Sequence, residues 1–306
     1  MLKVDRIDRS FGKKKVLDQV SFTVDAGALT GFVGGNGAGK TTTMRIMIGV
    51  LAAQSGTVSI NGQPLGPDGR RSFGYMPEER GLYPKMKASE QLAYLARLHG
   101  FDRRSATQRA NDLLERLELG ERKNDPLDSL SLGNQQRVQI AAALVHDPKV
   151  LILDEPFSGL DPMAVEVVLG VLSEYAERGV PVLFSSHQLD LVERLCDKLV
   201  IIAGGQIRAE GTRNDLRERF GDRRHQITTA TDAGWVRSVP GARVVELDGG
   251  SAVFEGGDAV AQDVLSRAMA QDTVLGFGPI TPTLGEIFKD VVTDEVDDSG
   301  AKESAA

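Results

Sequence analysis

The stretch "GGNGAGKTT", residues 34–42, decides the fold of this chain. It satisfies the pattern G-x-x-x-x-G-K-[ST] through four residues, Gly34, Gly39, Lys40 and Thr41. The apolar run "LTGFV" before it predicts a strand over residues 29–33, and "TTTMRIMIGVL" after it predicts a helix. A strand, this loop and a helix in succession form the context that a phosphate-binding loop requires.

The residue types of this loop fit the phosphates of a nucleotide. Its glycines allow successive backbone N–H groups to curl around a phosphate without Cβ clashes. We expect Lys40 to reach the β- and γ-phosphates and the Thr41 hydroxyl to bind Mg²⁺, so the expected ligands are a nucleoside triphosphate and Mg²⁺. The residues expected to hold the nucleotide here are Gly34, Asn36, Gly37, Ala38, Gly39, Lys40, Thr41 and Thr42.

Two acids follow a second apolar run, "LILDEP" at residues 151–156. We expect Asp154, at the end of this strand, to hold the Mg²⁺ ion. Glu155 would point at the γ-phosphate and polarise a water molecule for in-line attack. An isolated acid at such a place is often only a helix N-cap, but two acids downstream of a phosphate loop favour the catalytic interpretation.

The composition describes an ordinary globular protein of 306 residues, with 41% hydrophobic and 26% charged residues and a net charge of −7. The acidity lies in the last part, because residues 221–306 hold 7 basic and 15 acidic side chains. Aromatic residues make up 5% of the chain and no broad basic face is implied, which argues against a nucleic acid as partner. A single cysteine, Cys196, forms no intrachain disulfide and favours a cytosolic location.

The chain divides near residue 220. Short apolar runs alternate with helical patterns before that point, which predicts an α/β domain over 1–220, with a helical pattern at 88–119 and a hairpin about Gly204-Gly205. A small α+β accessory domain is predicted over 221–292 and a disordered acidic tail over 293–306. Within the accessory domain we expect two strands about Gly249-Gly250, a helix over 258–271, a strand over 273–278 and a closing helix over 281–292.

Six sequence elements in this order resemble the nucleotide-binding subunit of an ABC transporter. They are Phe11, "GGNGAGKTT", "GYMPEERGLYP", "LSLGNQQR", "LILDEP" with "SGLD", and "FSSH". The resemblance covers about residues 1–220 and implies a P-loop NTPase cassette with a mixed sheet core, an antiparallel β subdomain and a helical subdomain at about 80–148.

The resemblance also explains a second hydroxyl-and-glycine pair, Ser131 and Gly133 in "LSLGNQQR". In the family this stretch closes over the nucleotide of a second cassette, so two chains pair head to tail. Asp161 of "SGLD" resembles the acid that crosses this interface. Taken alone, Ser131 is equally an ordinary helix N-cap. Leu132 departs from the usual glycine, and the sequence leaves open whether the cassette pairs with itself or with a sister chain.

Three further residues take their expected roles from the resemblance. Glu78 stands where the family usually has a glutamine that touches Mg²⁺, so it is either a metal ligand or a carboxylate in a solvated loop. His187 matches a histidine that bonds the γ-phosphate, although a lone histidine is more often structural. Phe11 matches an aromatic that stacks on adenine, with core packing as its alternative.

The function that the resemblance implies is an ATPase that drives export of a substrate through a separate transmembrane permease. "GYMPEERGLYP" and "TPTLGEIFKDVV" resemble sodium- or drug-efflux cassettes. The chain would then lie in the cytoplasm, peripheral to the inner face of the membrane, since no apolar run is long enough to span a bilayer. The alternative is a regulatory or weakly hydrolysing cassette. The transported substrate and the role of the accessory domain stay open.

Overall fold

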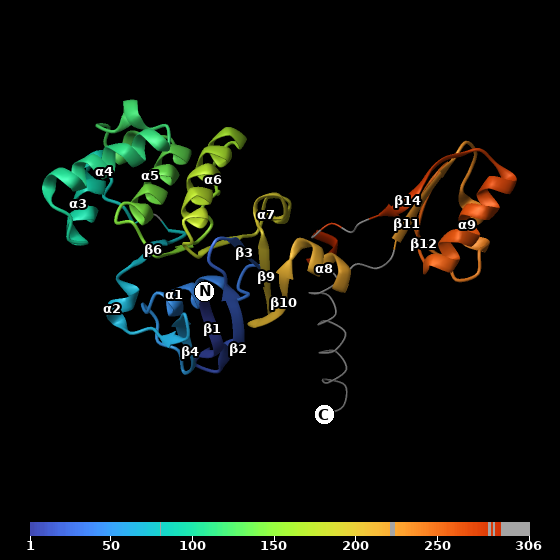
Figure 1. The fold of residues 1–306 in the computed structure, drawn as a ribbon, viewed down its shortest axis with the longest axis horizontal. Helices are drawn as coiled ribbons and strands as arrows, with labels where there is room; N and C mark the ends of the chain where they lie inside the picture. Colours follow the sequence, from blue (N-terminus) through green and yellow to red (C-terminus); the bar gives the residue numbers. More distant parts are fainter. Residues whose placement is uncertain (80, 221–223, 281–282, 284, 289–306) are drawn as a thin grey trace. The chain divides into compact units, whose positions relative to one another are not determined.

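The computed structural model describes residues 1–79, 81–220, 224–280, 283 and 285–288. It forms two compact units, Met1–Arg213 and Asn214–Ala306 (Figure 1). The division by spatial contacts falls just before the boundary at residue 220 that composition suggests.

A six-stranded sheet forms the centre of the first unit, with strand order β10-β9-β3-β8-β7-β6. Five neighbouring strands are parallel, and β10 pairs antiparallel with β9 at one edge. Every residue of β3, β7 and β8 is buried, because these short strands are mostly apolar and have both faces covered. The strands are β3 (Leu29–Val33), β6 (Phe73–Met76), β7 (Val150–Leu153), β8 (Val182–Ser186), β9 (Lys198–Ala203) and β10 (Gln206–Thr212).

A second, antiparallel sheet has the order β2-β1-β4-β5. Apolar side chains from its inner face share one core with Met44 and Met47 of helix α1 (Lys40–Met47). Asn61 and Gly62 connect β4 and β5 with φ of +48° and +81°, values that suit the tight hairpin turn that Asn-Gly predicts. The strands are β1 (Leu2–Phe11), β2 (Lys14–Val24), β4 (Ser55–Ile60) and β5 (Gln63–Pro64).

Three helices gather on one side of the first unit, in green in Figure 1, namely α3 (Ala88–Leu98), α4 (Arg103–Arg116) and α5 (Leu132–Leu144). The helical pattern predicted over 88–119 is broken by Gly100, at a φ of +94°, and restarts where the Asp102 side chain caps α4. The remaining helices are α1 (Lys40–Met47), α2 (Pro67–Arg70), α6 (Pro162–Glu177) and α7 (Leu189–Leu195). None of the helices described is long and apolar enough to cross a bilayer. The predicted combination of mixed sheet, antiparallel sheet and helical subdomain is confirmed.

The second unit contains a four-stranded antiparallel sheet with order β12-β13-β11-β14. Its core includes Ile227, Phe254 and Val264. The predicted strand pair about Gly249-Gly250 and the predicted helix over 258–271 are confirmed, whereas β11 was not expected from the sequence. Its strands and helices are α8 (Arg213–Phe220), β11 (Arg224–Thr229), β12 (Arg243–Asp248), β13 (Ser251–Glu255), α9 (Asp258–Gln271) and β14 (Val274–Ile280).

The two last predicted segments lie largely or wholly outside the described residues. Residues 285–288 of the expected closing helix are helical, and the rest of the 281–292 segment is described only at Thr283. The acidic segment 293–306 lies entirely outside the described part of the chain.

Candidate functional site

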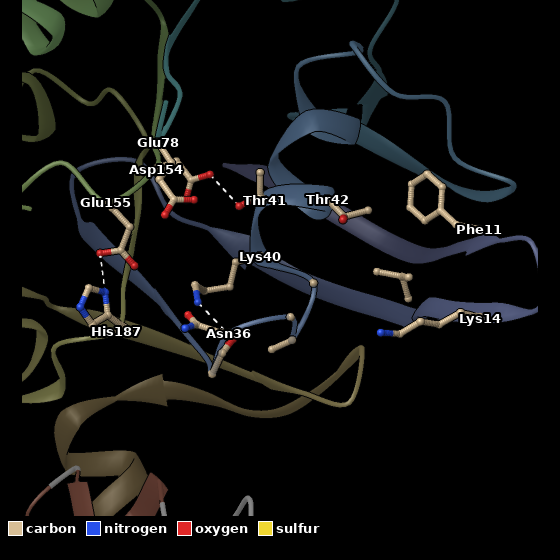
Figure 2. Close-up of a pocket in the computed structure, with 15 residues that line it drawn as sticks. Phe11, Lys14, Asn36, Lys40, Thr41, Thr42, Glu78, Asp154, Glu155 and His187 are labelled. Carbon is tan, nitrogen blue, oxygen red and sulfur yellow. Dashed lines mark hydrogen bonds and ion pairs between the residues drawn. The ribbon is translucent and has the colours of Figure 1, made fainter. Parts of the chain in front are cut away.

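A cavity of about 460 Å³ opens at the carboxyl ends of the parallel strands (Figure 2). The carboxyl ends of β3, β6, β7 and β8 are followed by the phosphate loop, Glu78, the two acids and His187. Parallel strands bring such residues to a common edge, which is why segments far apart in sequence meet here. The lining residues are Phe11, Lys14, Val16, Gly35, Asn36, Gly37, Ala38, Gly39, Lys40, Thr41, Thr42, Glu78, Asp154, Glu155 and His187.

The loop over residues 34–39 depends on two glycines for its shape. Gly39 has a φ of +111°, and a Cβ there would lie 2.6 Å from Leu17 Cδ2. A Cβ on Gly34 would lie 2.4 Å from the Ile202 carbonyl oxygen. The Lys40 ammonium is held along the loop, where Nζ donates to the Gly34 carbonyl at 2.6 Å. The loop is therefore a tightly packed cradle with its lysine inside it.

Asp154 connects this loop to the central sheet. The Thr41 hydroxyl donates to its Oδ2 at 2.8 Å, and the Ser185 hydroxyl donates to its Oδ1 at 2.5 Å. The same Ser185 oxygen accepts the backbone N–H of Glu155 at 2.9 Å, so one hydroxyl on β8 orders both acids. The Asp154 carboxylate also raises the pKa of nearby Tyr75, after burial, which is the larger cause.

Glu155 is held in an unusual backbone conformation. Its φ is +52°, in the left-handed region that residues other than glycine rarely adopt. Its carbonyl accepts a hydrogen bond of 2.9 Å from Gln136 Nε2 on α5. Its side chain is only 12% exposed, and Oε2 lies 3.0 Å from Nδ1 of His187. Strain of this kind at an acid that lines a cavity is a common mark of a functional site.

The donor set at this end of the cavity suits a hard divalent cation. Thr41 and Asp154 offer a hydroxyl and a carboxylate oxygen in direct contact, and Glu78 adds an exposed carboxylate at the cavity wall. Oxygen ligands of this kind, completed by phosphate and water, are what Mg²⁺ prefers. The residues present therefore fit a Mg²⁺–nucleotide complex.

Phe11 lines the other end of the cavity, far along it from Glu155 in Figure 2. Its side chain is 48% exposed, so it is not a core residue. The Arg9 guanidinium carbon lies 4.8 Å from the centroid of its ring. Lys14 pairs with Phe11 across the β1–β2 hairpin and also lines the cavity.

Three residues predicted to bind nucleotide do not line this cavity, namely Ser131, Gly133 and Asp161. Ser131 is the N-cap of α5, and its Oγ accepts the Asn134 N–H at 3.3 Å. Asp161 similarly caps α6 through a bond of 2.9 Å from the Ala164 N–H. Leu132, between the first two, is 62% exposed.

Gly34 is also absent from the lining, and it acts through its carbonyl contact with Lys40. Sequence reasoning in turn missed several residues that the fold brings to the site. The "FSSH" motif contained Ser185, and "LSLGNQQR" contained Gln136, but neither was assigned a role. Three residues that line the cavity were also missed, namely Lys14, Val16 and Gly35.

Comparison with known proteins identifies two matching families. A model described as ABC transporter matches residues 17–158. A second, described as ATP-binding protein DrrA1-3-like, C-terminal domain, matches residues 211–292. The two matches fall mainly on the first and the second unit of the structure.

Individual relatives agree with these matches. The ABC transporter ATP-binding protein YhaQ of Bacillus subtilis (strain 168) is 36% identical over 289 residues, which are 94% of this chain and 97% of YhaQ. The linearmycin resistance ATP-binding protein LnrL of the same organism is 36% identical over 72% of each chain. A solved ATP-binding subunit of an ABC transporter is 37% identical, with a TM-score of 0.67, over 72% of this chain and 93% of that chain.

The relatives confirm the resemblance that the six sequence elements indicated. Because one relative at 36% identity is matched over nearly its whole length, the chain belongs to the ABC transporter family, as an ATP-binding subunit that hydrolyses ATP and carries a DrrA-like C-terminal domain.

Proposed function

We propose that this chain is one of two cassettes that pair head to tail around ATP and drive export of a substrate through a separate transmembrane permease. One observation carries this proposal. Apart from Gly34, whose carbonyl bonds Lys40, the predicted phosphate, metal and catalytic residues line a single cavity, whereas Ser131, Gly133 and Asp161 do not line it. A site that lacks part of its predicted ligand set within one chain is the arrangement expected when a second chain supplies that part.

In this proposal, the nucleotide lies along the cavity with its base at Phe11 and its phosphates at the loop. The exposed Phe11 ring stacks on adenine. Backbone N–H groups of residues 35–39 and the start of α1 bind the phosphates, since a helix N-terminus favours an anion. Lys40, already placed inside the loop, needs only a short shift from the Gly34 carbonyl to a phosphate oxygen.

We propose that Thr41, Asp154 and Glu78 hold Mg²⁺, directly or through water. The ion supplies charge neutralisation for the phosphate oxygens when it is bound. Asp154 is 1% exposed and fixed at both carboxylate oxygens, so its position is set before any ligand arrives. Glu78 sits in an exposed position and brings a carboxylate where the family usually has an amide.

Hydrolysis in this proposal depends on Glu155 and His187. Glu155 accepts a proton from the attacking water or orients it, as a carboxylate beside the γ-phosphate can. The contact of 3.0 Å between His187 Nδ1 and Glu155 Oε2 keeps the imidazole next to this acid. From there His187 reaches a γ-phosphate oxygen and responds when that phosphate leaves.

The permease contact and the direction of transport rest on the relatives and on exposed side chains of the helical subdomain. Tyr83, Tyr94 and Leu98 are 62%, 43% and 64% exposed, which suits a protein interface rather than a solvated surface. One relative is named for resistance to linearmycin, and in this chain a DrrA-like domain follows the cassette. We therefore place the chain at the inner face of the membrane, in an efflux system.

A mixing experiment tests the shared site. A Lys40→Ala chain and a Ser131→Arg chain should each be inactive, because in each homodimer both composite sites have one damaged half. Mixed together, they form a heterodimer with one site built from two intact halves, so part of the ATPase activity should return. If mixing restores nothing while both variants bind the other chain, head-to-tail sharing is wrong.

The Glu155→Gln variant provides the matching physical measurement. It should bind ATP without splitting it and elute as a dimer with ATP and Mg²⁺ on size-exclusion chromatography. With ADP it should elute as a monomer, because the γ-phosphate is absent. A monomer under saturating ATP would contradict the proposal.

A further inference from the structure

Two glutamines of α5, Gln136 and Gln139, are buried and make contacts outside their own helix. They are only 6% and 4% exposed. Residues three apart lie on the same side of a helix, so both amides face the sheet. Each amide nitrogen donates to two backbone carbonyls at the end of a strand, one pair after β7 and the other after β6.

Gln139 holds the backbone on both sides of Glu78. Its Nε2 donates to the Pro77 carbonyl at 2.6 Å and to the Glu79 carbonyl at 3.3 Å. With the carbonyls on either side converging on one amide, the backbone at Glu78 has little freedom to rotate. The Glu78 side chain, which lines the cavity, is thereby aimed by a residue that does not touch the cavity.

Gln136 holds the backbone at the second acid and at the residue after it. Its Nε2 donates to the carbonyls of Glu155 at 2.9 Å and Pro156 at 3.1 Å. Glu155 has the left-handed φ of +52°, a conformation that persists only where neighbouring groups enforce it. Gln136 and Ser185 are such groups, because Gln136 bonds the Glu155 carbonyl and Ser185 bonds the Glu155 N–H.

We propose that α5 sets the separation of Glu78 and Glu155, with Gln139 and Gln136 as positioning residues. The helix has 13 residues and begins directly after Ser131, its N-cap. An α-helix of this length moves as a rigid body, so displacement of its first turn reaches both acid loops at once. The inference rests on the proposed function, in which Ser131 meets the nucleotide of the second chain. Binding of Ser131 to the nucleotide of the second chain would then shift Glu78 and Glu155 in this chain's own site.

The first test uses Gln139→Leu, which removes the donor at similar volume, in the full-length chain. Its matched control is Gln91→Leu, because Gln91 is 1% exposed and its amide also bonds loop backbone, at Tyr83. We expect both variants to lose similar thermal stability. Hydrogen exchange at the amides of residues 78 and 79 should rise only in Gln139→Leu. Equal exchange in the two variants would overturn the proposal. If Gln139→Leu does not fold, Gln139→Met serves in its place.

The second test asks whether Gln139 acts through Glu78. We expect Gln139→Leu to lower kcat about tenfold with little change in the KM for ATP, because misplacement affects the chemical step more than binding. Combined with Glu78→Ala, the substitution should cause no further loss, since residues that act as a unit are non-additive. If the two losses multiply, Gln139 does not act through Glu78.

Failure of the α5 proposal and failure of the proposed function give different experimental results. A wild-type rate for Glu78→Ala would remove the role of Glu78 in hydrolysis, and hydrogen exchange at residues 78 and 79 would still decide whether Gln139 holds that loop. Unchanged ATP binding in Lys40→Ala would instead show that the nucleotide site itself is misplaced.

Discussion

Glu155 and His187 are in direct contact, with Oε2 of the carboxylate 3.0 Å from Nδ1 of the imidazole. The two side chains differ sharply in exposure, at 12% for Glu155 and 56% for His187. The acid is thus largely buried, while more than half of the histidine side chain is exposed. We expect the acid to govern the chemical step and the histidine to assist it.

The first prediction concerns these two residues. Glu155→Gln should lower kcat by a factor of about 10² or more, the usual effect of losing a general base, while the Kd for ATP stays within about twofold. His187→Ala should cause a smaller loss of kcat. Steady-state ATPase assays with equilibrium binding of ATP measure both quantities. A rate for Glu155→Gln equal to that of the wild type would exclude Glu155 as the general base.

The second prediction concerns Phe11, whose ring has the Arg9 guanidinium 4.8 Å from its centroid. Stacking of a base on an aromatic ring contributes about 1–3 kcal/mol, so Phe11→Ala should weaken ATP and ADP binding by about tenfold or more. Phe11→Tyr should bind normally. Arg9→Gln should weaken nucleotide binding less, because the Phe11 ring remains and loses only its contact with the guanidinium. Fluorescence titration with a labelled nucleotide measures these affinities, and unchanged binding in Phe11→Ala would place the base elsewhere.

The third prediction concerns Lys14, which projects into the cavity beside the phosphate loop in Figure 2. Lys15 next to it forms ion pairs with Asp8 and Asp18, whereas no ion pair joins Lys14 to any residue that the structure describes. Lys14→Met should therefore weaken the binding of ADP and of ATP by the same factor of about ten, with kcat unchanged. Lys13→Met changes the net charge equally from outside the lining and should have no effect. Equal affinities in the two variants would exclude a nucleotide contact for Lys14.

The fourth prediction concerns acid stability. Burial is the main reason that the pKa of His146 is lowered from 6.5 to about 4, and the stacked ring of His99, 3.9 Å away, lowers it further. Between pH 6.5 and about 4, His146 binds a proton in the unfolded chain but stays neutral in the folded chain. Its contribution to the free energy of unfolding is therefore complete above pH 6.5 and is lost as the pH falls to about 4. The unfolding temperature should fall through that window. His146→Gln, which keeps a donor for the Phe73 carbonyl 3.0 Å away, should flatten the slope, and an unchanged slope would rule His146 out.

The sequence predicts this fold well wherever one local signal decides an element. The strand Leu29–Val33 has the expected bounds, because it is a wholly apolar run that ends at a glycine loop. The helix Asp258–Gln271 also has the expected bounds. The strand Arg224–Thr229 was missed because its inward residues are His225, Ile227 and Thr229, and only one of these three is strongly apolar.

The location of the candidate site was predictable where a motif marks it and not where the contacts are tertiary. The phosphate loop, the two acids and His187 follow from their motifs and line one cavity. Gln136 and Gln139 read in sequence as polar residues of a surface helix. Gln136 bonds Glu155, which lies 19 positions away along the chain, and Gln139 bonds Pro77, which lies 62 positions away. Only the fold brings these residues together.

We expect the left-handed backbone at Glu155 to produce a trade-off between its proposed catalytic role and the thermal stability of the chain. A glycine at this position would relieve about 1 kcal/mol of conformational strain and, in removing the carboxylate, would abolish turnover. Laboratory selection for heat resistance alone would consequently enrich dead cassettes, so any directed-evolution campaign on this subunit needs ATP cleavage as a second criterion.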